Sequence, residues 1–357
     1  MSVKNIFLII LTLVVAAAII FFTIQENQKP KQKIDLFLRL QPGEHHELKL
    51  AHLQETIQTY KDKMFKLDTK VEALMGFDVV NVDADGAMNL NFYYKAIAVD
   101  ANNGQQHIIY DSAKPPVDSN DEMLNAIAEV YSAVIGNKLS MKVSQMGESG
   151  EIKGFDEIRK KLEEKIRKDA AAEVNDPNLS EKDKEAIEVL RKMFMESATK
   201  QKMSFYNTIL ASIISDTKEI AYNIFTKYPD RPVSTGNSWY DKTVLNLNFE
   251  VDADVTYIFK RKENGVVYID VISDVDMGKD FKIAEITSRE KITKNISGVR
   301  SATNAVDEAT GLLHKSEAII KFKGTQHVET DKTVLPIRPN MDIPIRIEGS
   351  TIIELIK

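Results

Sequence analysis

The stretch FKRKENGVVYID (residues 259–270) places two strand-forming runs on either side of an Asn-Gly pair. An Asn-Gly pair readily adopts the positive φ values of a type I′ turn, which joins two antiparallel strands. Alternating residues continue on both sides of the turn, within Tyr240–Arg261 and Val266–Val275. The sequence therefore predicts long antiparallel strands as the main elements of the fold.

Further turns and alternating runs surround a middle region with helical spacing. Asp83-Ala-Asp-Gly86 predicts a hairpin turn, after which Met88, Leu90 and Phe92 alternate as in a strand. In the middle region apolar residues recur with the period of amphipathic helices. The expected helical stripes are Met123–Val134, Phe155–Ile166 and Met203–Phe225, and further expected strands are Ile34–Leu40, Lys138–Ser144, Phe281–Thr303, Leu312–Lys323, Lys332–Ile337 and Ile343–Ile356.

These patterns predict an α+β fold. We expect long antiparallel strands forming a curved sheet or half-barrel packed against a central helical insertion, preceded by one N-terminal transmembrane helix. The alternative is two separate β domains bridged by helices, and similar turn motifs leave open whether the two blocks are a repeat. The expected parts are a membrane anchor or signal sequence (1–24), a linker (25–33), an N-terminal β block (34–118), a mainly helical middle (119–228) and a C-terminal β block (229–357), with 34–357 as one structural unit.

The N-terminal run Ile6–Ile24, IFLIILTLVVAAAIIFFTI, carries no charged residue. A helix of this length spans roughly 28 Å, close to the ~30 Å hydrocarbon core of a bilayer. A cleaved signal peptide is the alternative, with the small residues Ala16–Ala18 as its cleavage site. The run stays apolar beyond these alanines, which favours an uncleaved anchor. We expect the membrane to be a partner of the chain through Ile6–Ile24.

The orientation of this anchor rests on two opposing signals. Lys29, Lys31 and Lys33 follow the run, and a strict positive-inside count places the C-terminal side in the cytoplasm. Large domains, however, cross membranes largely regardless of such charges. We therefore expect a single-pass membrane protein with its body on the extracytoplasmic side, in the cell envelope or periplasm. Secretion after signal cleavage is the alternative.

Composition excludes several classes of function. The chain has 357 residues, a net charge of −6 and no cysteine. A mildly acidic chain lacks the clustered Lys and Arg of a nucleic-acid footprint, so we expect no nucleic-acid partner. The absence of cysteine excludes disulfides, cysteine–zinc sites, thiol nucleophiles and a lipidated cysteine.

Three stretches together resemble a known family. They are KLSMKVS (138–144) with GEIKGFDE (150–157), PDRPVSTGNSW (229–239) and DEATGLLHKSE (307–317). They are similar to a family of exported, mostly bacterial proteins of unknown function, many of them lipoproteins, over roughly Ile34 to Gly324. Family members often begin with a lipobox cysteine, and this chain has an apolar run in its place. The resemblance implies an envelope protein and transfers no catalytic residue.

Several short motifs suggest chemistry, and each has a simpler structural explanation. Asp83-Ala-Asp-Gly86 resembles the start of a calcium loop but lacks the later ligands, so a hairpin turn is favoured. His45 and His46 would point to opposite faces of a strand, and with His52 we expect them to be surface histidines. Ser-x-x-Lys occurs at 197–200, 215–218 and 288–291 without the partner motifs of penicillin-recognising enzymes. We expect no catalytic, cofactor-binding or metal-binding residues.

Two other features have structural explanations. Trp239, the sole tryptophan, is expected to anchor the core, and Arg159–Lys168 to form a solvated helix face. Asp156 and Glu157 precede this face at the spacing of i,i+4 ion pairs with Lys160 and Lys161.

The apolar segment Met203–Phe225 carries the functional expectation. It is the helix expected to lie against the sheet, where it could cover a cavity for a lipid or another apolar ligand. We therefore expect a non-enzymatic, membrane-tethered binding protein whose ligand-binding residues are not identified. The alternatives are a structural or protein-interaction component of the envelope, with an envelope protein as partner, and an exported hydrolase with dispersed acidic residues.

Overall fold

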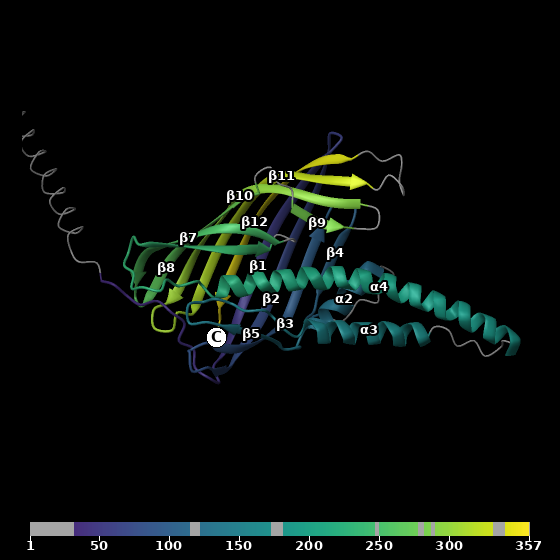
Figure 1. The fold of residues 1–357 in the computed structure, drawn as a ribbon, viewed down its shortest axis with the longest axis horizontal. Helices are drawn as coiled ribbons and strands as arrows, with labels where there is room; N and C mark the ends of the chain where they lie inside the picture. Colours follow the sequence, from purple (N-terminus) through teal and green to yellow (C-terminus); the bar gives the residue numbers. More distant parts are fainter. Residues whose placement is uncertain are drawn as a thin grey trace, which may run out of the picture.

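The computed structural model describes residues 32–114, 122–172, 181–246, 250–277, 282–286, 290–330 and 340–356. These residues form three helices and one sheet of twelve strands (Figure 1). The strand order is β4-β3-β2-β1-β12-β11-β10-β8-β7-β6, with β5 paired to β3 and β9 paired to β10. Every one of these pairings is antiparallel.

The chain builds the sheet from two strand-rich halves. The first half gives β1 (His45–Tyr60), β2 (Lys63–Val82), β3 (Met88–Asn102), β4 (His107–Asp111) and β5 (Leu139–Val143). The second gives β6 (Ser238–Asn246), β7 (Glu250–Glu263), β8 (Val266–Asp276), β9 (Lys282–Ile286), β10 (Glu290–Asp307), β11 (Leu313–Thr330) and β12 (Met341–Leu355). Between them lie α2 (Glu122–Val134), α3 (Phe155–Ala172) and α4 (Glu181–Ile224).

The first and last strands join these halves. β1 runs beside β12 from the pair Leu48–Leu355 to the pair Gln58–Ile345. The chain thus starts at the centre of the sheet, moves to one edge, and returns from the opposite edge to the centre. The expectation of one curved antiparallel sheet is confirmed, and the alternative of two separate β domains is not what the chain forms.

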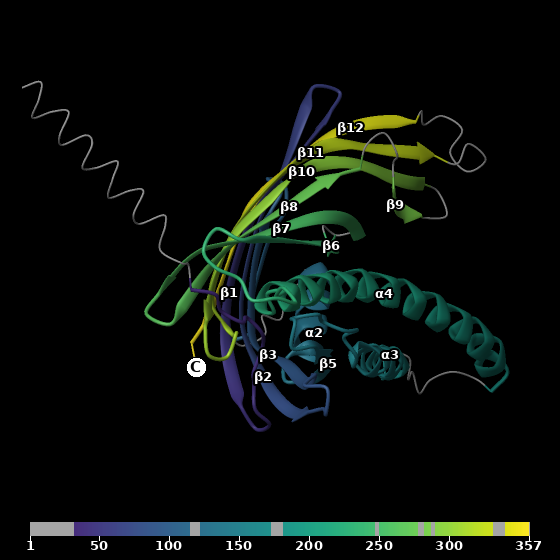
Figure 2. The same ribbon diagram turned by 60° about the vertical axis from the view of Figure 1, so that its left-hand side comes forward.

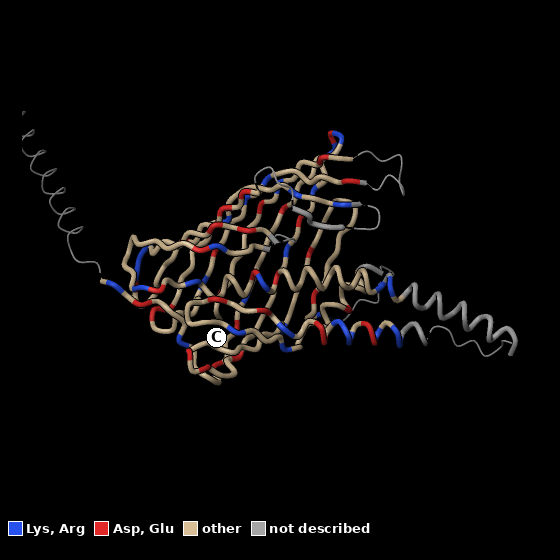
Figure 3. The backbone as a smooth tube through the Cα atoms, in the orientation of Figure 1, with Lys and Arg blue, Asp and Glu red and all other residues tan. Residues whose placement is uncertain are grey.

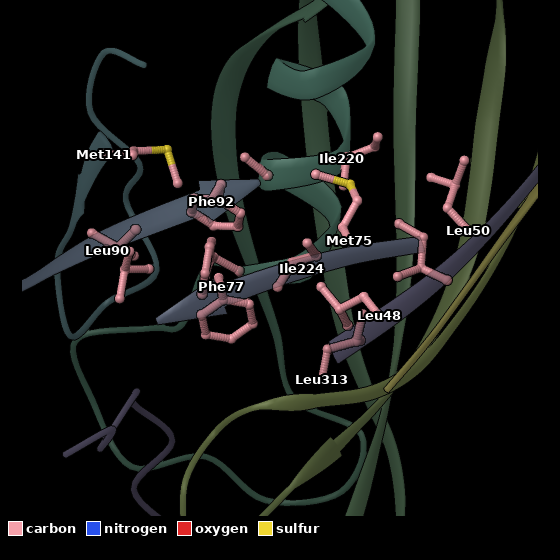
Figure 4. Packing of buried hydrophobic residues seen from close by; sticks show 14 of the residues in the cluster. Leu48, Leu50, Met75, Phe77, Leu90, Phe92, Met141, Ile220, Ile224 and Leu313 are labelled. Atoms are coloured by element: carbon pink, nitrogen blue, oxygen red, sulfur yellow. The ribbon is translucent and has the colours of Figure 1, made fainter. Parts of the chain in front are cut away.

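The sheet curves, and the three helices lie on its concave side (Figure 2). Alternation along the strands explains this packing, because buried residues such as Ala73, Met75 and Phe77 of β2 share one face of the strand. Ile220 and Ile224 of α4 lie over this face, next to the side chains of β1, β2 and β3 (Figure 4). The predicted central helical insertion is therefore confirmed.

Tight turns set the registers of the hairpins. Asn264 and Gly265 have φ values of 51° and 79°, as the predicted turn between β7 and β8 requires. The β1–β2 turn uses Lys61 and Asp62, with φ values of 48° and 61°. Sequence inspection missed this turn because a Lys-Asp pair is a weak signal for positive φ.

Three strand expectations need comment. Residues 34–40 are extended and bury Leu36, Leu38 and Leu40, but their only ladder contact is the bridge between Ile34 and Val233. The prediction of a strand there is wrong, because isolated backbone hydrogen bonds to separate loops replace a ladder. The stretch 281–303 was expected to be one strand, whereas β9 and β10 divide it. The expected strand 332–337 lies outside the described residues.

The expected membrane anchor, Ile6–Ile24, also lies outside the described residues. Among the helices that are described, none combines the length and apolar composition needed to cross a bilayer.

Candidate functional site

Helix α4 is tied to the concave face by polar contacts as well as by apolar packing. The hydroxyl groups of Tyr94 on β3 and Thr217 on α4 lie 2.8 Å apart and are both buried. Two residues beyond the end of α4, Thr226 accepts a hydrogen bond at Oγ1 from Nδ2 of Asn304 on β10, at 2.9 Å. These contacts fix the C-terminal half of α4 at a defined height above the sheet.

A cavity remains between α4 and the strands, which we call the α4 cavity. Its wall is formed by β1, β2, β3, β11 and β12 from the sheet, by α4, and by Tyr131 of α2. The space open to water-sized spheres is about 80 Å³. Most of the lining side chains are apolar or aromatic: Leu50, Val71, Ala73, Tyr94, Ile97, Tyr131, Ile213, Ile220, Ile320 and Ile347.

Polar groups lie at defined positions in this apolar wall. Asp216, Glu219 and Asn223 follow each other along one face of α4, because residues three and four apart share a helix face. From β1, His52 reaches the cavity with its Nδ1 atom 2.8 Å from Oγ1 of Thr351. The cavity therefore combines an apolar body with a few polar contacts, as small-molecule sites commonly do.

The pKa values of the lining residues reflect this enclosed environment. Burial, followed by the neighbouring Glu219 carboxylate, raises the pKa of Asp216 to about 7. Burial also raises the pKa values of Tyr94 and Tyr131. Near neutral pH a substantial share of Asp216 is thus protonated and able to donate a hydrogen bond into the cavity.

The predicted histidine sites separate in the structure. His45 lies on the outer face of β1, with Nδ1 2.8 Å from Oδ1 of Asp78, whereas His46 packs on the buried ring of Phe77. The opposite orientation of these two histidines is confirmed. His52 is half-buried and lines the α4 cavity from β1, so the expectation that it is a surface residue holds only in part.

The other short motifs have structural roles. Asp83 and Gly86 close the β2–β3 turn through a hydrogen bond from the Gly86 amide to the Asp83 carbonyl, at 2.9 Å, so the hairpin prediction is confirmed. Ser215 of the Ser-x-x-Lys motif at 215–218 is buried in α4, and Lys218 is exposed. The side chains of Ser197 and Ser288 lie outside the described residues. Within the described part of the chain, no three His, Asp or Glu residues are grouped to hold a metal ion.

Trp239 and the charged face of α3 also match their structural explanations. The indole N–H of Trp239 donates to the Lys227 carbonyl at 2.9 Å, and its ring stacks on Tyr257 at a centroid distance of 5.5 Å. On α3, Asp156 pairs with Arg159 at 2.6 Å, and not with Lys160 as expected. Charges of both signs are mixed along α3 and over the strands (Figure 3).

The fold and the cavity together define a class of protein: an open, curved antiparallel sheet whose concave face encloses an apolar cavity beneath a helix. A model of the family of unknown function DUF6263 matches residues 85–313, more than half of the chain. The chain therefore belongs to this family. The expected membership of a family of unknown function is confirmed, and the match says nothing of export or of lipid attachment.

Comparison with other proteins adds little beyond the family. No curated protein matches the sequence significantly. A solved structure described as "Lipid-protein interactions in lipovitellin" is similar with a TM-score of 0.45 and 8% identity, over 89% of this chain and 26% of that one. The chain thus spans about a quarter of the length of that lipovitellin chain. A similarity at this level assigns neither a fold nor a ligand.

Proposed function

We propose that this chain is a non-enzymatic binding protein that holds a lipid or another apolar ligand in the α4 cavity. The observation that carries the proposal is the cavity itself, which lies between α4 and the concave face of the sheet and has a mostly apolar wall. Apolar side chains supply most of the affinity in such sites, and a few polar groups set orientation. Asp216, Asn223 and His52 are the residues placed to do this.

The size of the cavity determines how a ligand would enter. About 80 Å³ holds a few water molecules or a short aliphatic segment, and a complete acyl chain needs more room. A longer ligand is accommodated only if α4 moves away from β1 and β2. The hydrogen bond of Tyr94 to Thr217 of α4, and that of Asn304 to Thr226 just beyond the end of α4, restrain this movement, so ligand binding and helix displacement are coupled.

The same small volume favours a second candidate function. If the cavity holds only water, α4 is a plug that completes the core, and the chain is a structural or protein-interaction component of the envelope. The extensive buried cluster that unites α4 with both halves of the sheet supports this alternative.

The remaining part of the proposal concerns where in the cell the protein is located. Its support is the apolar run Ile6–Ile24, which has the length of a single membrane span. The proposed arrangement is a single-pass anchor with the body on the extracytoplasmic side, and secretion after cleavage is the alternative. An alkaline phosphatase fusion after Lys33 tests the orientation, because an inactive fusion would place the body in the cytoplasm.

Ligand binding is tested on the purified full-length chain in two ways. Native mass spectrometry is expected to find a co-purifying lipid or acyl compound, and a fluorescent fatty acid is expected to bind with a defined stoichiometry. The absence of both would leave the structural alternative.

A further inference from the structure

Arg300 is a buried cation on the concave face of β10. Only 2% of its surface is exposed, and its guanidinium donates to Oδ1 of Asn223 on α4. No carboxylate forms an ion pair with Arg300 among the described residues. An unpaired buried charge is strongly unfavourable, so a buried arginine with only an amide partner points to a missing negative charge.

Two buried polar atoms beside Arg300 also lack hydrogen-bond partners in the part of the chain that the structure describes. They are Nδ2 of Asn223 and Oγ of Ser273, the residue opposite Arg300 on the neighbouring strand β8. Because the guanidinium fixes the Asn223 oxygen towards itself, the Nδ2 donor must point elsewhere. Both residues are almost completely buried, so neither atom is satisfied by bulk solvent. A guanidinium, an amide N–H and a hydroxyl form a donor set that suits an anion.

This donor set reaches the α4 cavity through Asn223, whereas Arg300 and Ser273 lie behind the residues that line it. Asn223 lines the cavity, and Ile320, the residue opposite Arg300 on β11, lines it as well. The acidic residues of the cavity lie on the N-terminal side of Asn223 in α4. Glu219 and Asp216 precede Asn223 by four and seven residues, or roughly 6 and 10 Å along the axis. A negative group is therefore directed to the Asn223 end of the cavity.

We propose that Arg300, Asn223 and Ser273 bind the acidic headgroup, carboxylate or phosphate, of an amphipathic ligand whose apolar part occupies the α4 cavity. This inference rests on the proposed function and names the chemical class of its ligand. The planar guanidinium supplies the charge, and the other two side chains complete the hydrogen bonds of the headgroup oxygens.

Three ligands with the same tail test the headgroup site: palmitic acid, hexadecyl phosphate and hexadecan-1-ol. Calorimetric titration of the full-length chain at pH 8 is expected to show at least about tenfold tighter binding of one acidic ligand than of the alcohol. The preferred acid distinguishes a carboxylate site from a phosphate site. Arg300→Met is expected to abolish this preference and to leave the affinity for the alcohol unchanged.

Two further variants keep the test decisive. Arg346→Met removes an exposed arginine that pairs with Glu55 on the outer face, and the preference should remain. Ser273→Ala removes one donor with little change in volume, and it should weaken acid binding by about three- to tenfold. Equal affinity of the wild-type chain for all three ligands would overturn the headgroup site while the apolar cavity stands. Binding of none of them would contradict both proposals.

Discussion

Tyr94 of β3 and Thr217 of α4 share a buried hydrogen bond, with their hydroxyl oxygens 2.8 Å apart. The Thr217 hydroxyl also lies 2.6 Å from the carbonyl oxygen of Ile213, one turn earlier in the helix. Tyr94 also lines the α4 cavity. The bond between Tyr94 and Thr217 therefore helps to set the distance between α4 and the wall of the proposed site. How firmly α4 is held on the sheet is therefore a measurable property.

Tyr94→Phe removes the hydroxyl and keeps the ring. Thr217 retains its bond to Ile213, so we expect the free energy of unfolding to fall by only about 1 kcal/mol, as for one net hydrogen bond. Urea denaturation followed by circular dichroism measures this change. Tyr240→Phe is the matched control, because Tyr240 is 77% exposed and its substitution should have no effect. Equal stability of the two variants would contradict the role of the Tyr94 contact.

Trp239 should be among the largest single contributors to stability. Trp239→Ala removes the stacking on Tyr257 and the hydrogen bond to Lys227, and we expect a loss of about 3–5 kcal/mol in the free energy of unfolding. Trp239→Phe keeps an aromatic ring and should lose less. Tyr240→Ala, at the neighbouring exposed position, should change stability by less than about 0.5 kcal/mol. A Trp239→Ala chain as stable as Tyr240→Ala would show that the indole does not anchor the core.

The backbone of β10 approaches Gly324 of β11 so closely that this position requires glycine. A Cβ atom at this position would lie 1.9 Å from the carbonyl oxygen of Asn295 on β10. Gly324→Ala should therefore cost on the order of 2–4 kcal/mol, because the strands must separate locally. Gly76→Ala is the comparison: its Cβ meets the ring of Tyr93, a side chain that can rotate away. Thermal unfolding measures the stability of both variants. A larger loss of stability in Gly76→Ala than in Gly324→Ala would contradict this explanation.

Asp216 should make stability depend on pH. Its pKa is raised to about 7 in the folded chain, by burial and then by Glu219, whereas an unfolded aspartate titrates near ~3.9. Between about pH 4 and 7 the folded chain keeps a proton that the unfolded chain releases. The free energy of unfolding should thus fall as pH rises through this window and stay low above it.

Asp216→Asn isolates this effect. The stability advantage of the variant over the wild-type chain should grow by on the order of 2–4 kcal/mol between pH 5 and pH 8. The titratable groups that line the cavity with Asp216 are Glu219, on the same face of α4, and Tyr94, Tyr131 and His52 from other elements. Asp254→Asn, at an exposed carboxylate, should show no such growth. A pH-independent difference for Asp216→Asn would exclude a raised pKa.

Much of the fold follows from local signals in the sequence. Asn264-Gly265 and Gly86 fix two hairpins through their positive φ values. Pairing between distant strands follows from no local signal. The β1–β12 ladder joins residues about 300 positions apart, and only the complete sheet defines that register. The extended segment 34–40 alternates like a strand yet finds no partner ladder.

The residues of the site were harder to predict. The helix Met203–Phe225 was correctly expected to cover the sheet, but Asp216 and Asn223 resemble ordinary polar positions of an amphipathic helix. Arg300 offered one usable signal. On β10 it alternates onto the same, inward-facing side of the strand as Ile296, Ala302 and Val306, which are buried. An arginine among the apolar residues of one strand face indicates a buried charge, but the strand pairings were needed to identify its neighbours.

Binding of a fluorescent fatty acid to the full-length chain and two alanine variants tests the central claim most directly. Ala73 of β2 lines the α4 cavity, and Ala98 of β3 lies opposite Glu72 on the outer face. Thermal unfolding first confirms that both variants are folded. Ala73→Leu fills the cavity and should weaken binding at least about tenfold, whereas Ala98→Leu should bind like the wild-type chain. Equal binding by all three chains, or no binding by the wild-type chain, would contradict a ligand site beneath α4.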